Sequence, residues 1–162
     1  MPSADARARK LARRARQLRR AGRLDAASAA VDSALQCASD APRAELTALA
    51  CAIELDRGRV DGIEARLSAL LSAPATPNDG NALAHARAHY ELGRLCASQR
   101  RFAAAHEHLL AALHAPDLPS VEGEPGALLR LRALTTLGTT DCMQGRHAQG
   151  LAHLQAAHAR FS

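Results

Sequence analysis

Among the residues that could bind a metal ion or catalyse a reaction, the histidines have the most suggestive spacing. His85 and His89 lie four residues apart, and His106 and His108 follow on the next helical segment. Histidines four apart share one face of a helix and can bind a divalent metal there. No Cys or carboxylate is placed by the sequence to complete a tetrahedral set. We therefore interpret these residues as exposed histidines on alanine-rich helices and predict no metal site.

The sequence shows no recognisable catalytic arrangement. It contains no glycine-rich phosphate loop, no G-x-S-x-G and no H-E-x-x-H. Glu45 and Asp56 lie eleven residues apart with no nucleophile near them in sequence. We expect a protein that is not an enzyme, with no catalytic residue and no cofactor.

The four cysteines are widely separated, without a C-x-x-C pair, at Cys37, Cys51, Cys96 and Cys142. Each falls in a helical stretch, which is typical of reduced, buried thiols in a cytosolic protein. No apolar run approaches the roughly 20 residues that span a bilayer, and no hydrophobic signal segment follows Met1. We expect a soluble, cytoplasmic protein without a membrane segment.

Positive charge is concentrated at the start of the chain. Residues 1–23 hold nine of the 21 Lys and Arg residues and a single acid, Asp5. Clustered arginines can contact phosphates, so nucleic-acid binding is an alternative function. It is disfavoured because single-strand binding normally uses aromatic side chains, and the first 80 residues contain none. Membrane-surface association is weaker still, since residues 7–20 offer only Leu11 and Leu18 as bulky apolar anchors.

Any site must be positioned by helices, because alanine, leucine and arginine dominate and aromatic residues make up 2% of the chain. One pattern recurs four times: a glycine or polar turn position, an apolar residue two later (His147 in the fourth copy), then small and apolar residues at fixed offsets. The turn positions are Gly22, Gly58, Arg100 and Gly145. Their spacings of 36, 42 and 45 residues place extra length in two Pro- and Gly-rich loops, Ser72–Gly80 and Ala115–Gly126.

Small residues mark where paired helices should touch. A Leu-Gly pair ends seven residues before each of the last two turn positions, at Gly93 and Gly138. Antiparallel helices approach closely only where their side chains are small. We therefore expect Gly93 to face Ala105 and Gly138 to face Gly150.

These features resemble the tetratricopeptide-repeat family, whose unit of roughly 34 residues carries Leu-Gly, a turn glycine and A-x-x-x-F/Y-x-x-A. The resemblance covers nearly the whole chain, but Arg14-Ala15 and Ala50-Cys51 replace Leu-Gly in the first two units. Most of the family's large aromatic residues are also missing, so the chain resembles a divergent member. The resemblance implies one all-α domain, 1–162, folded as a right-handed α-solenoid of about four antiparallel helix pairs. The units would be 8–41, 44–77, 86–119 and 131–162.

The resemblance implies that partners bind in a concave groove lined by the first helix of each unit. The groove positions that we select in this chain hold seven arginines and a tyrosine: Arg9, Arg16, Arg19, Arg20, Arg87, Tyr90, Arg94 and Arg132. Guanidinium groups bind carboxylates bidentately, so we expect a protein or peptide partner with an acidic or C-terminal carboxylate segment. The Lys and Asn pairs by which some members clamp a terminal carboxylate are absent. The alternative is that these arginines form a solvated face.

The last predicted helix, Gly150–Phe161, carries an apolar stripe of Leu151, Leu154, Ala157 and Phe161. Repeat arrays usually end in a helix with a polar outer face. We therefore expect either that the polypeptide continues or that a second copy covers the stripe in a homodimer. Because similar arrays in bacteria often regulate a signalling output domain, a regulatory or sensory N-terminal module is a further hypothesis.

Overall fold

A computed structural model describes residues 1–73, 81–115 and 125–160. These residues form eight α-helices and no strand, which confirms the all-α prediction. The helices are α1 (Ala4–Arg20), α2 (Leu24–Cys37), α3 (Asp40–Asp56), α4 (Ile63–Ser72), α5 (Asn81–Ser98), α6 (Phe102–Leu113), α7 (Pro125–Met143) and α8 (His147–Ala159). They fall into two compact units, Met1–Ala84 and His85–Ser162, which are described separately below.

The four predicted turn positions all have left-handed backbone conformation. Their φ angles are 73° at Gly22, 75° at Gly58, 60° at Arg100 and 80° at Gly145. After each, an arginine N–H closes the preceding helix by donating to the carbonyl five residues back, as from Arg23 to Leu18 at 2.9 Å. Glycine suits this conformation because it has no Cβ, whereas Arg100 adopts it at a cost of about 1 kcal/mol.

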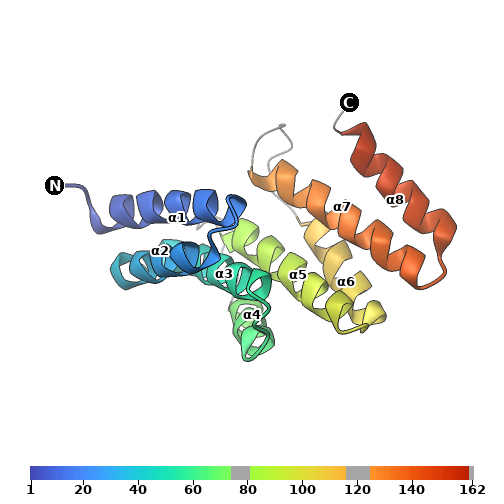
Figure 1. Cartoon of the computed structure of the whole chain (residues 1–162), viewed down its shortest axis with the longest axis horizontal. Coiled ribbons are helices and arrows are strands. Elements are labelled where there is room, and N and C mark those ends of the chain that lie inside the picture. Colours follow the sequence, from blue (N-terminus) through green and yellow to red (C-terminus); the bar gives the residue numbers. More distant parts are fainter. Residues whose placement is uncertain (74–80, 116–124, 161–162) are drawn as a thin grey trace. The chain divides into compact units, whose positions relative to one another are not determined.

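In the first unit, α1 packs against both α2 and α3, and α3 also contacts α4. Figure 1 shows α1 and α2 joined by a short connection at the blue end of the chain. The buried faces are built largely from alanines such as Ala8 and Ala27, with Val31 and Ile53 filling the remaining space. Ala15 and Cys51, which stand where the family has the glycine of Leu-Gly, are fully buried.

In the second unit, α7 packs against both α6 and α8, and α5 meets α6 at Gly93 (Figure 1). A Cβ added to Gly93 would lie 2.6 Å from Leu109 Cγ and 3.5 Å from the Ala105 carbonyl oxygen. A Cβ added to Gly138 would lie 2.9 Å from the Gly150 carbonyl oxygen. The expected facing pairs are therefore confirmed. The sequence pattern did not indicate that Leu109 fills the space over Gly93.

Several helices begin earlier than the sequence units suggested. α1 begins at Ala4 because the Ser3 hydroxyl caps it, accepting a hydrogen bond of 3.2 Å from the Ala6 N–H. α7 begins at Pro125 rather than at 131, and α8 at His147 rather than at Gly150. The two predicted loops fall mainly on 74–80 and 116–124, which lie outside the described residues, as does Phe161.

The four cysteines are thiols. Cys51 and Cys96 are buried as predicted, whereas Cys37 and Cys142 are partly exposed. Cys142 lies at the closest approach of α7 and α8, where its sulfur would clash with a side chain at position 150. Position 150 of α8 therefore requires glycine.

Candidate functional site

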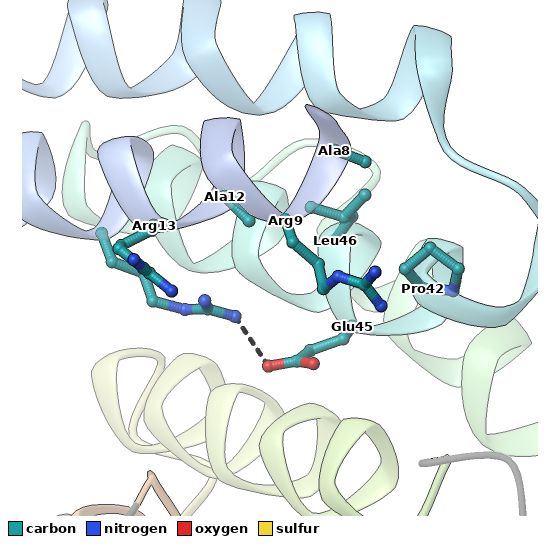
Figure 2. Close-up of a pocket in the computed structure, with 8 residues that line it drawn as sticks. Ala8, Arg9, Ala12, Arg13, Pro42, Glu45 and Leu46 are labelled. Atoms are coloured by element: carbon teal, nitrogen blue, oxygen red, sulfur yellow. Dashed lines mark hydrogen bonds and ion pairs between the residues drawn. The ribbon is translucent and has the colours of Figure 1, made fainter. Parts of the chain in front are cut away.

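A pocket of about 230 Å³ lies between α1 and α3 in the first unit. Three arginines of α1, Arg9, Arg13 and Arg16, recur at intervals of three and four residues and so share one face of the helix. Figure 2 shows Arg9 and Arg13 projecting from α1 on the side where Glu45 lies. The remaining lining residues are Ala8, Ala12, Pro42 and Leu46. The pocket therefore has an apolar wall of small residues and a rim of guanidinium groups.

Positive charge exceeds negative charge in this pocket. Arg16 donates to Glu45 Oε1 at 2.7 Å, while its buried Nε has no hydrogen-bond partner among the described residues. Arg13 makes no ion pair with any residue that the structure describes. The pKa of Asp5 is lowered, chiefly by hydrogen bonds from the backbone and hydroxyl of Ser39 and less by the charge of Arg9. The pocket can thus accept a further anionic group.

The structure brings together part of the predicted groove in the first unit. Arg9 and Arg16 line the pocket, where Arg16 pairs with Glu45. Arg19 Nε lies 2.5 Å from Asp56 Oδ2. Arg20 is exposed on α1 and does not line the pocket. The family positions missed Arg13, which helical spacing from Arg9 would have identified.

The predicted groove residues of the second unit lie on α5 and α7. Tyr90 is buried, and the Arg94 guanidinium lies 5.9 Å from the centre of its ring. Arg94 also donates to the buried Glu91 at 2.7 Å, so part of its charge is directed into the protein. Arg87 is half-buried on α5, whereas Arg132 is exposed on α7.

A buried carboxylate, which sequence analysis did not identify, joins three helices of the second unit. The side chain of Asp141 on α7 is 0% exposed. Arg146 from the following turn donates to it at 2.5 Å, and the Nδ1 atoms of His106 and His153 lie 3.1 and 3.0 Å from its two oxygens. Burial raises the pKa of Asp141, but the hydrogen bond and charge of Arg146 and the two histidines outweigh it and hold the pKa below its ordinary value.

Glu54 on α3 forms a similar but more open network in the first unit. Its side chain accepts hydrogen bonds from Ser28 at 3.2 Å and from Arg57 at 2.8 Å, and it pairs with Arg59 at 3.4 Å. Partial burial raises the pKa of Glu54, but Arg57, Ser28 and Arg59 together lower it below its ordinary value. The network borders a pocket of about 360 Å³ that Arg66 also lines.

The two networks use the same repeat positions. Glu54 and Asp141 each lie four residues before a turn position, and Arg59 and Arg146 each lie one residue after it. Their partners Ser28 and His106 each lie six residues after the preceding turn position. The contact of α2 with α3 in the first unit thus corresponds to the contact of α6 with α7 in the second.

The four histidines considered in the sequence do not form one cluster. His106 contacts Asp141, whereas His108 faces His89, with their Nδ1 atoms 3.1 Å apart. All four, His85 included, are half-buried rather than exposed, which corrects the interpretation of solvated histidines. Burial, followed by the nearby rings of His108 and His85, lowers the pKa of His89. Within the described ranges, no group of three or more His, Cys, Asp or Glu side chains is arranged to hold a metal ion.

Comparison of the chain with protein-family models, with curated proteins and with solved structures found no match. Among the described helices, none combines the length and apolar character needed to cross a membrane.

Proposed function

We propose that this protein is a non-catalytic interaction scaffold that binds an acidic segment of a protein partner through the basic pocket between α1 and α3. We further propose that its helix pairs stack as a divergent, tetratricopeptide-like right-handed solenoid of antiparallel pairs. By analogy of fold alone, such a scaffold would serve as a regulatory or sensory module of a bacterial signalling protein.

Internal repetition supports the proposed architecture. Four left-handed turns, each closed by an arginine N–H, recur at the predicted positions. The carboxylate networks of Glu54 and Asp141 repeat one contact between successive helix pairs. A stack of similar pairs produces such recurrence because each repeat contacts its neighbour in the same register.

The observation that carries the proposed function is the unbalanced charge of the pocket. Three arginines face a single acid, and the Arg16 Nε is a buried donor without an acceptor among the described residues. An incoming carboxylate can accept from the exposed guanidinium groups of Arg9 and Arg13 without displacing Glu45 from Arg16. Hydrogen bonds to charged groups contribute about 1.5–3 kcal/mol each, and the alanines that line the pocket add an apolar wall.

Charge reversal within and beside the pocket tests the proposal. We expect the double variant Arg9→Glu/Arg13→Glu to weaken binding of a labelled oligoglutamate peptide about tenfold or more in fluorescence anisotropy. The matched control is Arg7→Glu/Arg14→Glu, which makes the same change of net charge on exposed residues of the same helix that do not line the pocket. Equal losses in both variants would show that only overall charge matters and would contradict the pocket.

The same variants test the alternative of nucleic-acid binding. Arg7, Lys10, Arg14, Arg20 and Arg23 are exposed and extend the basic surface of the first 23 residues beyond the pocket. A nucleic-acid function predicts that a labelled single-stranded oligonucleotide binds more tightly than the peptide, with a steep loss of affinity as salt increases. Both double variants would then weaken binding to a similar degree.

A further inference from the structure

We propose that His89 of α5 and His108 of α6 form a two-histidine site for a late first-row divalent metal ion such as Ni²⁺, Cu²⁺ or Zn²⁺. The ion would bind the two Nδ1 atoms and link the two helices. The remaining coordination positions would be filled by water. This site is separate from the basic pocket and independent of the proposed function.

The separation of the two nitrogens fits metal coordination. The rings are tilted by 39°, with centroids 5.4 Å apart, and bring the two Nδ1 atoms to 3.1 Å. Imidazole nitrogens bind zinc at about 2.0–2.1 Å, so nitrogens 3.1 Å apart subtend roughly 95–100° at an ion between them. This angle lies between those of octahedral and tetrahedral coordination, so the separation of the two nitrogens fits a chelate.

The chemistry of the pair also favours a metal. Two imidazoles in this geometry can share one proton in an N–H···N bond, but protonating both facing nitrogens brings two donors together. A divalent ion can take the place of this proton and bind both Nδ1 lone pairs, while the proton of the neutral donor ring moves through solvent to that ring's own Nε2. The surroundings of His89 favour its neutral ring, which is the form that binds metals. Imidazole suits nickel, copper and zinc better than magnesium or calcium.

Neighbouring residues define the extent of the site. His85 lies one helical turn before His89 on α5, where it acts electrostatically on that ring. His106, two residues before His108, is held instead by Asp141 and Arg146. Among the described residues the site therefore has two ligands, and we expect the modest affinity of an open chelate rather than that of a closed structural site.

Nickel titration of the untagged full chain tests the site. We expect isothermal titration calorimetry to detect one Ni²⁺ ion bound by the wild-type protein, with affinity reduced about tenfold or more in His108→Gln and in His89→Gln. The matched control is His114→Gln on α6, because His114 is exposed and its Nδ1 lies 3.0 Å from the Leu110 carbonyl oxygen. That variant should bind as the wild type does.

A second measurement keeps the test decisive if a variant fails to fold. Because the ion links α5 to α6, Ni²⁺ should raise the melting temperature of the wild-type protein relative to the same protein in EDTA. An unchanged wild-type melting temperature overturns the proposal. It is also overturned if folded His108→Gln and His89→Gln bind Ni²⁺ with the same affinity as His114→Gln, which would place binding at other histidines.

Discussion

The carboxylates of Glu54 and Asp141 occupy the same repeat position in the two units but are stabilised differently. Asp141 has a short side chain that is completely buried, and it is reached by histidines of α6 and α8 and by Arg146. Glu54 is 19% exposed and borders an open pocket, with Arg57 and Arg59 supplying most of the positive charge. The carboxylate at this position can thus be either a buried link between helices or part of a partly exposed network.

The position eight residues after the turn accounts for part of this difference. It holds His153 in the second unit, which contacts Asp141 Oδ2. The corresponding residue of the first unit, Arg66, lines the pocket beside Glu54 but forms no ion pair with it. A compact imidazole thus closes the second network from α8, whereas the longer arginine leaves the first one open to water.

The largest effect should come from removing the two charges without changing side-chain shape. We expect Asp141→Asn to lower the free energy of unfolding by about 2–4 kcal/mol, because Arg146 and the two histidines lose a fully buried, charged acceptor. Glu54→Gln should cost about 1 kcal/mol or less, because Glu54 is itself partly exposed and Arg57 keeps its ion pair with Asp25. Urea denaturation followed by circular dichroism measures both. Equal losses would show that the two networks contribute alike, despite their different burial.

Acid should weaken the same two networks. The Asp141 pKa is lowered from 3.8 and the Glu54 pKa from 4.5, so each carboxylate contributes its full stability above its unfolded-state pKa. That contribution disappears as pH falls through the lower folded-state pKa. The difference in unfolding free energy between the wild type and Asp141→Asn should therefore shrink as pH falls below about 4. A difference that grew below that pH would contradict the sign of the shift.

A substitution at Gly150 tests whether the contact between α7 and α8 can accommodate the alanine that the first unit has at the corresponding position. The equivalent residue of the first unit is the buried Ala27. In Gly150→Ala the new Cβ would lie 2.7 Å from the Gly138 carbonyl oxygen and would also clash with Cys142 Sγ, so we expect a loss of about 1–3 kcal/mol. Gly93→Ala is the control and should cost less, since its closest obstacle is the movable side chain of Leu109. Thermal denaturation compares the two, and a harmless Gly150→Ala would mean that α7 and α8 can separate freely.

Local features of the fold were predictable from the sequence, whereas its polar networks were not. Gly22 and Gly145 could be identified as turns because a left-handed residue is a local requirement of the backbone. Gly93 and Gly138 followed from the need for small residues where helices cross. The partners of Asp141 could not be found in this way, since His106 and His153 lie 35 and 12 residues away. Their pairing depends on how α6 and α8 pack against α7.

The candidate site was also predicted only in part. Arg9 and Arg16 were identified through family positions, but the exposure and partner of each arginine depend on tertiary contacts, such as that between Arg16 and Glu45. The pairing of His89 with His108 likewise depends on the relative rotation of α5 and α6. Residue spacing along one helix determines which side chains share a face, but it does not determine what the facing helix presents to them.

The smallest effect on stability should come from substituting Leu151, on the face of α8 that was predicted to form an apolar stripe. Leu154 would contact a side chain at Gly138 and Ala157 is buried, so within the described part of that stripe Leu151 is the exposed residue, at 55%. Leu151→Glu should therefore change the free energy of unfolding by about 0.5 kcal/mol or less. A wild-type dimer that becomes a monomer in this variant, measured by light scattering, would assign α8 to an interface between copies. Identical monomer masses would instead count against the homodimer, because a glutamate at the centre of an apolar interface would lose its hydration on association.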